Sequence, residues 1–476
     1  MYSYMTYQDF IERASVDKAD AIRELVNQWK LGDIYRTAMD ADEYDAQRNT
    51  FIRSYVRTIL SLTGEPLVDF TASNNKISSN FFHRLNTQRC TYSLGNGITF
   101  AKDSIKEKFG KKLDTRASDA GYFALIHGVT FVYIGDGLHV FKATGFAPLF
   151  DEEDGRLRAG ARFWQLGPDK PMTVVFYEED GKTKYTQKNS DSPLQEAIEK
   201  TKYRQITQTS KAFGTEVVGE ENWLVGEDKK PTLPIVPWWG SKLHQSTLVG
   251  MKDKIDCFDL VRSGFANDLS DVAEIYWLVE NYGGMRDEDL QRFRDRVKLN
   301  HIANVDTSQG GKVTPYSQDI PFQARETFLA SIRNGIYEDF GALDVHAVAA
   351  GATNDHIDAA YQPMDENADD FEYQVIEAIQ NIGYILGIDE EDATPLFKRN
   401  RISNQKEQVD MLNTEAQWLD TETIISKLPN VTVDEVQDIL KRKEQEELDR
   451  FAMQAAMQNA QNPQEEEEEP EESEEV

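Results

Sequence analysis

The stretch from Leu243 to Gly387 constrains the fold most, because it predicts two long helices separated by an irregular insert and a shorter helix. The first helix is expected from Leu243 to Tyr282, and its apolar residues recur every three or four positions for about seven turns. These residues are Ile255, Phe258, Val261, Phe265, Leu269, Val272, Tyr276 and Val279. At ~1.5 Å per residue such a helix is about 60 Å long, more than the diameter of a small domain. It is therefore expected to pack against a structure outside its own domain.

Acidic residues occupy much of the remaining surface of this first helix, and few basic residues accompany them. The acidic residues are Asp253, Asp256, Asp259, Asp268, Asp271, Glu274 and Glu280, and the basic ones are Lys252, Lys254 and Arg262. The exposed side of the helix is therefore expected to be acidic. Gly283 and Gly284 follow the last apolar residue and signal the end of the helix.

The remainder of the stretch predicts an inserted module, a second helix, a loop and a long final helix. Residues 285–320 combine a charged run with short β-like pieces, as in a small module between two helices. Phe322 to Phe340 is typical of a helix that ends at Gly341. The small-residue sequence GALDVHAVAAGATNDH follows. The last helix is expected from Asp355 to Leu386, with a kink at Pro363 because proline lacks a backbone donor.

The flanking segments predict an α+β region before this stretch and short helices after it. Residues 5–62 show amphipathic helical spacing, and antiparallel hairpins are expected at Gly135 to Gly137 and at Asp180 to Gly181. Helices together with antiparallel strands indicate the α+β class. Residues 456–476 carry dense negative charge, which predicts a disordered tail.

Composition and motif content limit the possible functions. The 476 residues include 52 basic and 83 acidic ones, for a net charge of −31. This balance disfavours a broad basic surface that clamps nucleic acid by neutralising phosphates. Cys90 and Cys257 have no metal-type spacing and are expected to be buried free thiols. No apolar run approaches the roughly 20 residues of a membrane span, and the first residues lack signal-peptide features, so synthesis in the cytoplasm without membrane contact is expected.

No catalytic constellation is recognisable in the sequence. The seven histidines are scattered, and the HExxH, Walker, GxSxG and dinucleotide-binding patterns are missing from the sequence. Neither an enzymatic activity nor a cofactor or metal is therefore expected. The abundant carboxylates leave a two-metal site open on composition alone.

Three segments occur in an order that carries a resemblance. They are LPIVPWWGSKLHQS from Leu233, MKDKIDCFDLVRSGFANDLSDVAEIYWLV from Met251 and FLASIRNGIYEDFGALDVHAVAAGATNDHIDAAY from Phe328. Together they resemble the portal proteins of tailed bacteriophages, specifically the siphophage-like family. The resemblance implies an α+β portal fold with a wing in 1–240, a long stem helix in 241–282, a small α/β clip in 283–319 and a second stem helix in 320–340. A tunnel loop in 341–353, a kinked wing helix in 354–388, a wing end and helical crown in 389–455 and the acidic tail complete it.

The same resemblance implies a function and partners. Family members form a ring, a dodecamer in the procapsid, at one vertex of the capsid, and the ring belongs to the virion. Double-stranded DNA is packaged through it by the terminase and later ejected through it. The implied partners are other copies of the chain, the terminase large subunit at the clip, a head-completion adaptor and tail proteins, and scaffold and major capsid protein.

Three sets of candidate residues follow from this hypothesis. The tunnel-loop candidates are Leu343, Asp344, Val345, His346, Val348 and Thr353, and the clip candidates for terminase docking are Arg286, Arg292, Arg294, Arg296 and Lys298. The channel-lining candidates are Asp256, Asp259, Asp268, Asp271 and Glu274. An acidic lining repels the DNA backbone and lets the duplex slide, whereas lysines and arginines grip it. A solvated or inter-subunit face is an equally good explanation of these acids.

Two other classes stay open. A head-completion adaptor also forms a ring around DNA, although such proteins are usually much shorter. A DNA-processing enzyme would need a nucleotide or metal site.

Overall fold

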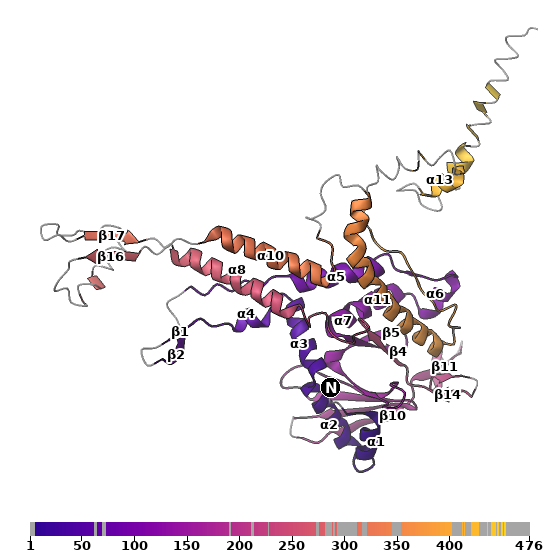
Figure 1. Cartoon of the computed structure of the whole chain (residues 1–476). Coiled ribbons are helices and arrows are strands. Elements are labelled where there is room, and N and C mark those ends of the chain that lie inside the picture. The colour runs from indigo at the N-terminus through magenta and orange to yellow at the C-terminus, as the bar shows by residue number, and fades with distance from the viewer. Residues whose placement is uncertain are drawn as a thin grey trace, which may run out of the picture. The chain divides into compact units, whose positions relative to one another are not determined.

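The computed structural model describes most of the chain, in two compact units. The described residues are 5–60, 64–68, 73–189, 192–210, 214–226, 228–272, 276–280, 312–316, 321–344, 354–401 and 420–427, with 288, 291–292 and short pieces between 412 and 453. Unit 1 comprises Met1–Leu343 and Gln362–Asn400, and unit 2 comprises Asp344–Tyr361 and Arg401–Val476. Helices and antiparallel strands mix in unit 1 (Figure 1), so the predicted α+β class is confirmed.

Four helices open the chain: α1 (Tyr7–Ala14), α2 (Lys18–Leu31), α3 (Asp33–Asp45) and α4 (Thr50–Ser54). Thr6 and Asp9 form a capping box at the start of α1, where each side chain accepts a hydrogen bond from the other residue's backbone. The helical spacing predicted up to residue 62 is wrong for residues 55–60, the described part beyond Ser54. Strand β1 (Thr58–Leu60) pairs there with β2 (Pro66–Val68), because Thr58 and Ile59 are β-branched and favour extended backbone.

Two antiparallel sheets form the body of unit 1. Five strands lie in the order β10-β9-β8-β7-β6, and three in the order β15-β4-β5. Their bounds are β4 (Val129–Ile134), β5 (Leu138–Lys142), β6 (Phe146–Phe150), β7 (Leu157–Gln165), β8 (Met172–Glu178), β9 (Gly181–Gln187), β10 (Gln195–Thr201) and β15 (Ile235–Trp239). Both predicted hairpins are confirmed, since Ile134 pairs with Leu138 and Glu178 pairs with Gly181.

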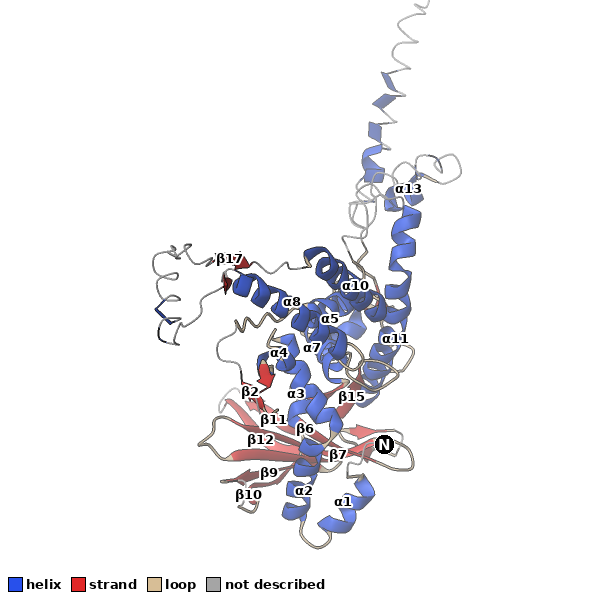
Figure 2. Cartoon of the chain, turned by 60° about the vertical axis from the view of Figure 1, so that its left-hand side comes forward, coloured by secondary structure: helices blue, strands red, loops and turns tan. Residues whose placement is uncertain are grey.

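Smaller elements connect these sheets to the helices. They are β3 (Ile98–Thr99), α6 (Asp103–Phe109), η1 (Ala143–Gly145), β11 (Arg204–Ser210), β12 (Gly214–Glu221), β13 (Leu224–Val225), β14 (Lys230–Pro231) and β18 (Leu396–Phe397). Helix α7 (Leu113–His127) runs directly into β4, and α1 and α2 lie against the larger sheet (Figure 2). Trp29 of α2 fixes this packing, because its indole N–H donates to the Ala143 carbonyl at 2.8 Å.

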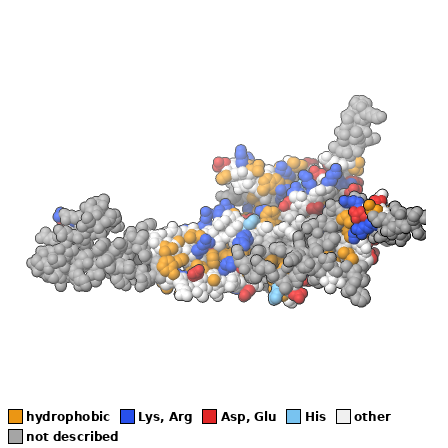
Figure 3. Space-filling model, turned by 90° about the horizontal axis from the view of Figure 1, so that it is seen from above, with side chains coloured by type: hydrophobic (Ala, Val, Ile, Leu, Met, Phe, Trp, Pro, Cys, Tyr) orange, Lys and Arg blue, Asp and Glu red, His pale blue; other side chains and the backbone are white. Residues whose placement is uncertain are grey.

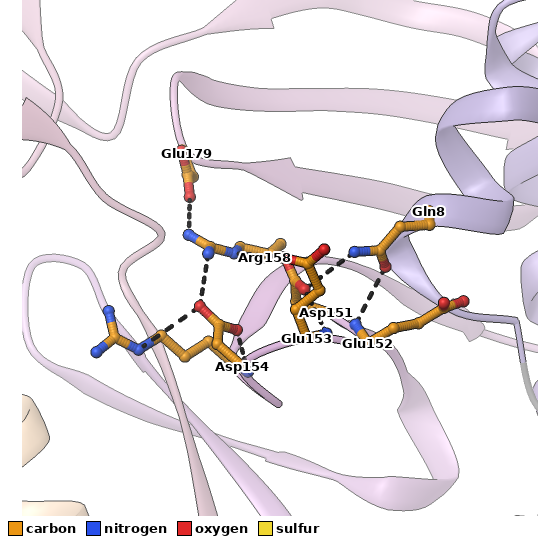
Figure 4. A network of polar contacts seen from close by, with 8 residues as sticks. Gln8, Asp151, Glu152, Glu153, Asp154, Arg158 and Glu179 are labelled. Carbon is orange, nitrogen blue, oxygen red and sulfur yellow. Dashed lines mark hydrogen bonds and ion pairs between the residues drawn. The ribbon is translucent and has the colours of Figure 1, made fainter.

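A polar network ties α1 to the loop between β6 and β7 (Figure 4). Arg158 lies at its centre and contacts Asp151 at 3.2 Å, Asp154 at 2.7 Å and Glu179 at 3.5 Å. The Gln8 amide donates to Asp151 at 2.9 Å. One guanidinium thus compensates three carboxylates, and the network is structural.

The long helix α11 (Asn354–Leu386) follows the predicted apolar register. The predicted inward residues are all buried: Ile357, Tyr361, Met364, Ala368, Phe371, Val375, Ile379 and Ile382. In unit 1, the Phe371 ring packs against Gly121 of α7, where an added Cβ would lie 2.9 Å from the ring. The helix runs through Pro363, and the kink itself stays a prediction.

The predicted helix from Leu243 to Tyr282 is too long at both ends. Helix α8 covers only Lys252–Val272, and β16 (Tyr276–Glu280) pairs antiparallel with β17 (Lys312–Tyr316). Tyr276, Trp277 and Val279 favour strands as much as they continue a helical stripe. A pairing partner more than thirty residues away decides between the two structures. The β-like pieces predicted near residues 302–305 lie outside the described residues.

Helix α10 (Phe322–Phe340) matches the prediction at both ends. Gly341 ends it in the left-handed region, at φ 62° and ψ 42°. In unit 2, Asp420 caps α13 (Thr421–Lys427) by accepting the Thr423 amide at 3.1 Å. Arg401 of the same unit lies 3.3 Å from Asp358.

Replacing Gly341 by alanine is expected to destabilise the protein by about 1–2 kcal/mol, because only glycine adopts the left-handed region without a steric cost. The added Cβ would also meet the Asn367 side chain, which must move. Urea denaturation measures the change. Gly137→Ala is the matched control, since nothing lies within 4 Å of a Cβ there and its φ is not left-handed. Equal effects of both substitutions would contradict the strain argument.

Candidate channel wall and its anchors

Helices α8 and α10 form an antiparallel pair (Figure 1). Near the start of α8, the Lys254 ammonium donates to the Gly335 carbonyl near the end of α10, at 3.4 Å. Near the end of α8, Phe265 packs edge-on against Phe322 at 5.4 Å, and Asp268 forms an ion pair with Arg325. We call this pair the stem. It corresponds to the two predicted stem helices, with α8 shorter than expected.

A polar stripe on α8 holds an extended segment of the N-terminal region. The side chains of Asp259, Ser263 and Asn267 accept the backbone N–H groups of Ser79, Ile77 and Asn75 at 2.9, 3.0 and 2.6 Å. Four helical residues rise about 6 Å and two extended residues span about 6.6 Å, so the two repeats match. We call residues 75–79 the strap.

Buried polar contacts continue this stripe to the base of α8. Asp256 is 7% exposed, accepts the Tyr44 hydroxyl and lies 2.8 Å from the Lys252 ammonium. Asp259 is fully buried and also accepts the Asn49 amide. Burial, followed by the bond to Asp256, raises the pKa of Tyr44 to about 12, and burial raises the pKa of Asp259 above its ordinary value.

These contacts correct the channel-lining prediction for two residues. Asp256 and Asp259 do not face a lumen, because α3, the residue before α4 and the strap cover them. Asp268 is half-buried and paired with Arg325. The Asp271 side chain and Glu274 lie outside the described residues, so their role stays a prediction. The contacts of Asp256 and Asp259 with Tyr44, Asn49 and the strap were not predicted. These partners lie about 200 residues away in sequence and follow no local pattern.

Helix α5 (Phe81–Leu94) anchors the end of α10. Arg84 donates to the Tyr337 hydroxyl at 2.8 Å, and Arg89 donates to the Phe340 carbonyl at 2.8 Å and stacks 4.4 Å from that ring. Burial lowers the pKa of Arg89 to about 10. Positive side chains at a helix C-terminus compensate its free carbonyls and dipole.

The described part of the predicted tunnel loop starts at this anchor. Leu343 is buried, and its carbonyl accepts the Gln88 amide at 3.1 Å, so it belongs to the anchored end of α10 rather than to a free loop. Asp344 is half-buried. Val345, His346, Val348 and Thr353 lie outside the described residues.

The same helix α5 also reaches α11. The Tyr92 hydroxyl donates to Asp365 of α11 at 2.6 Å. Arg399 lies 3.0 Å from Asp365, makes two contacts with Glu372 at 3.0 and 2.8 Å, and pairs with Asp369. Helix α5 therefore holds both helices that flank residues 345–353. Arg399 was not predicted as a site residue. Its place beside Arg401 in a basic segment that follows an acidic helix is a sequence feature that could have indicated these ion pairs.

The clip candidates are described at one position only. Arg292 is exposed. Arg286, Arg294, Arg296 and Lys298 lie outside the described residues. Among the described residues, no group of His, Cys, Asp or Glu is arranged to hold a metal ion. The helices in that part of the chain include none long and apolar enough to cross a membrane.

The two cysteines differ in exposure. Cys90 is buried as predicted, and burial raises the pKa of its thiol to about 12, whereas Cys257 is half-buried, contrary to the prediction. Since the thiolate is the reactive form, Cys90 is expected not to react with a thiol reagent at pH 8 in the folded protein. Thiol titration of Cys257→Ser checks this, with no reactive thiol before denaturation and one afterwards. Rapid labelling of the folded variant would show that α5 does not exclude solvent there.

Comparison with known proteins identifies the class. The family model described as "Phage portal protein, SPP1 Gp6-like" matches residues 41–449. The chain therefore belongs to this family of phage portal proteins.

Individual relatives agree with this assignment. The portal protein of Clostridium phage phiCD119 is 27% identical over 241 residues, covering 48% of this chain and 52% of that protein. The portal protein of Bacillus phage SPP1 is 22% identical over 437 residues, covering 83% of this chain and 80% of that protein. The chain thus matches about half the length of the first relative and most of the second.

Two solved structures are also similar. One is the neck of an empty GTA particle computed with C6 symmetry, with a TM-score of 0.42, 10% identity and coverage of 74% of this chain and 91% of that one. The other is the neck of a native GTA particle computed with C12 symmetry, with a TM-score of 0.37, 9% identity and coverage of 73% and 89%.

Proposed function

We propose that copies of this chain assemble into a closed ring that forms a DNA channel at one vertex of a phage capsid, with the stem as its wall. The terminase packages the genome through the ring, and the DNA later leaves through it. Family membership supports this role, and the exposed apolar side chains of the stem carry the argument for a ring.

These side chains lie on more than one side of the stem. Leu269, Phe322 and Phe328 are 47%, 52% and 49% exposed, and Figure 3 shows apolar side chains at the surface where α8 and α10 lie. Phe322 and Phe328 are six residues apart, so they point about 120° from each other around α10. One flat partner cannot cover both residues. Neighbours on two sides can, which is the arrangement of a subunit in a ring with heterologous contacts.

The charge of the stem surface suits a conduit. The exposed charged residues of the described part of α8 and α10 are Asp253, Glu326, Glu338, Asp339 and Arg262. Acidic residues therefore outnumber basic ones on this surface, so a duplex passing nearby is repelled rather than gripped. Salt limits this repulsion to about 8–10 Å.

The remaining assignments follow from the family. The sheets and N-terminal helices form the wing, 283–319 the clip, 341–353 the tunnel loop and 389–455 the wing end and crown. The terminase large subunit and then a head-completion adaptor dock at the clip, and scaffold and major capsid protein surround the wing. The ring is a component of the virion that is synthesised in the host cytoplasm, and it needs no cofactor.

Negative-stain imaging of the purified protein tests the proposal. Rings with a central hole wide enough for a duplex are the expected result. Compact particles without a hole, at every salt and protein concentration, would contradict the channel and return attention to a DNA-processing enzyme.

A further inference from the structure

The hairpin of β1 and β2 exposes apolar side chains on its described residues. We call residues 55–60 and 64–68 the arm. Its apolar side chains are exposed, with Tyr55 at 39%, Val56 at 45%, Leu67 at 51% and Val68 at 44%. An isolated two-stranded hairpin is marginally stable in water and gains stability by packing against another surface. The arm therefore has an apolar surface available for a partner.

The strap leads from the arm to the end of α8. The strap follows the arm in sequence, and Asn75 contacts both Asn267 and Ser270, close to the end of α8. Phe322 and Arg325 of α10 lie at the same level, because they contact Phe265 and Asp268. Asn75, which begins the strap seven residues after the arm, is thus level with the exposed Leu269 and Phe322.

The strap and α10 lie on opposite sides of α8. Lys254, Phe265 and Asp268 face α10, and they lie roughly half a turn around α8 from the stripe that holds the strap. The strap therefore leads away from its own α10. A rotation about the ring axis leaves the position of each residue along that axis unchanged. In a ring whose stems run along the axis, a neighbouring copy therefore presents its stem at the level of this strap.

The charges of the two surfaces permit contact between them. The arm is electrically neutral, because Arg57 and Glu65 are its only charged residues in sequence, in a chain whose net charge is −31. Helices α8 and α10 together carry five basic and eight acidic residues. A neutral arm thus meets a negative stem without repulsion, which favours this pairing over contact between two negative stems.

We propose that the arm of each copy packs against the exposed α8–α10 surface of the neighbouring copy and links adjacent subunits of the ring. This proposal rests on the ring proposed above. It names the contact that joins the subunits, with Leu67 and Val68 on one side and Leu269, Phe322 or Phe328 on the other. The contact is head-to-tail, so every copy gives one arm and receives one.

Cysteine cross-linking tests the contact directly. In a Cys257→Ser background, Leu67→Cys is combined with Phe322→Cys or with Phe328→Cys, and assembled protein is oxidised and run on a denaturing gel. A ladder of covalent multimers from at least one pair is expected, because each bond joins two chains. Val16→Cys with Phe322→Cys is the control, since Val16 is 90% exposed but lies outside the arm. Rings that give no ladder with either pair, or an equal ladder with the control, would overturn the arm contact while leaving the ring intact.

Assembly provides a second readout that needs no disulfide. Leu67→Ser with Val68→Ser is expected to raise the protein concentration for half-maximal ring formation at least tenfold, because exposed apolar area is lost without touching the core. Val16→Ser with Leu166→Ser removes side chains that are 90% and 87% exposed elsewhere, and it should leave that concentration unchanged. An unchanged concentration for the arm variant would contradict the proposal. Failure of the unmodified protein to form rings would instead contradict the proposed function.

Discussion

Replacing Phe371 by alanine is expected to lower the free energy of unfolding by about 4 kcal/mol, the usual cost of a large-to-small change in a well-packed core. Phe371 is 1% exposed and fills the space above Gly121, where α7 and α11 approach closely. The cavity cannot close easily, because both helices are fixed by further buried contacts. Urea denaturation followed by tryptophan fluorescence measures the change.

Tyr373 provides the matched control for this substitution. It lies two residues further along the same helix and is 69% exposed. Tyr373→Ala is therefore expected to change the free energy of unfolding by less than about 0.5 kcal/mol. Similar losses for both variants would mean that α11 does not present Phe371 to the core.

Replacing Asp259 by alanine is expected to cost about 3 kcal/mol. The substitution leaves the Ser79 amide and the Asn49 side chain unpaired in a buried place, and each lost partner costs roughly 1–3 kcal/mol. Removal of a buried carboxylate returns part of that cost. Asp253→Ala, at an exposed position of the same helix, should be nearly neutral. If Asp259 faced a water-filled channel instead, the two variants would behave alike.

The pH dependence of this difference gives an independent check. The pKa of Asp259 is raised in the folded protein above its ordinary value of 3.8, so the folded state binds the proton more tightly than the unfolded state does. The wild type therefore gains stability through Asp259 as the pH falls through the folded pKa toward 3.8. The alanine variant lacks this gain, and the gap between the two proteins should widen in that range. A gap that narrows would show that the carboxylate is stabilised as an ion.

Local patterns were sufficient for much of the fold. Both ends of helix α10 were predicted, because its apolar spacing is followed by Gly341. Glycine ends a helix by adopting left-handed backbone, and this property does not depend on distant residues. The turns at Gly135 to Gly137 and Asp180 to Gly181 likewise depend on neighbouring residues. The buried face of α11 followed from its spacing, and in unit 1 Phe371, Val375 and Ile379 pack into one core.

The errors have a common physical cause, which is pairing between residues distant in sequence. Tyr276 to Glu280 form a strand instead of continuing the predicted helix, because residues 312–316 pair with them. In the sequence, Asp256 and Asp259 are typical of exposed acidic residues on a helix. In the structure, Tyr44, Asn49 and Ser79 donate hydrogen bonds to them, which compensates the cost of their burial. A helical pattern predicts which residues share a face. Whether solvent reaches that face depends on the segments that pack against it.

The mass of the assembled protein tests the central claim most directly. Native mass spectrometry in moderate salt should give a closed ring, and twelve copies of the 54.3 kDa chain correspond to roughly 650 kDa. A narrow distribution at a ring mass is the result that a channel built from many stems predicts. A monomer or dimer that persists across protein concentration and salt would contradict it, because one or two stems cannot enclose DNA.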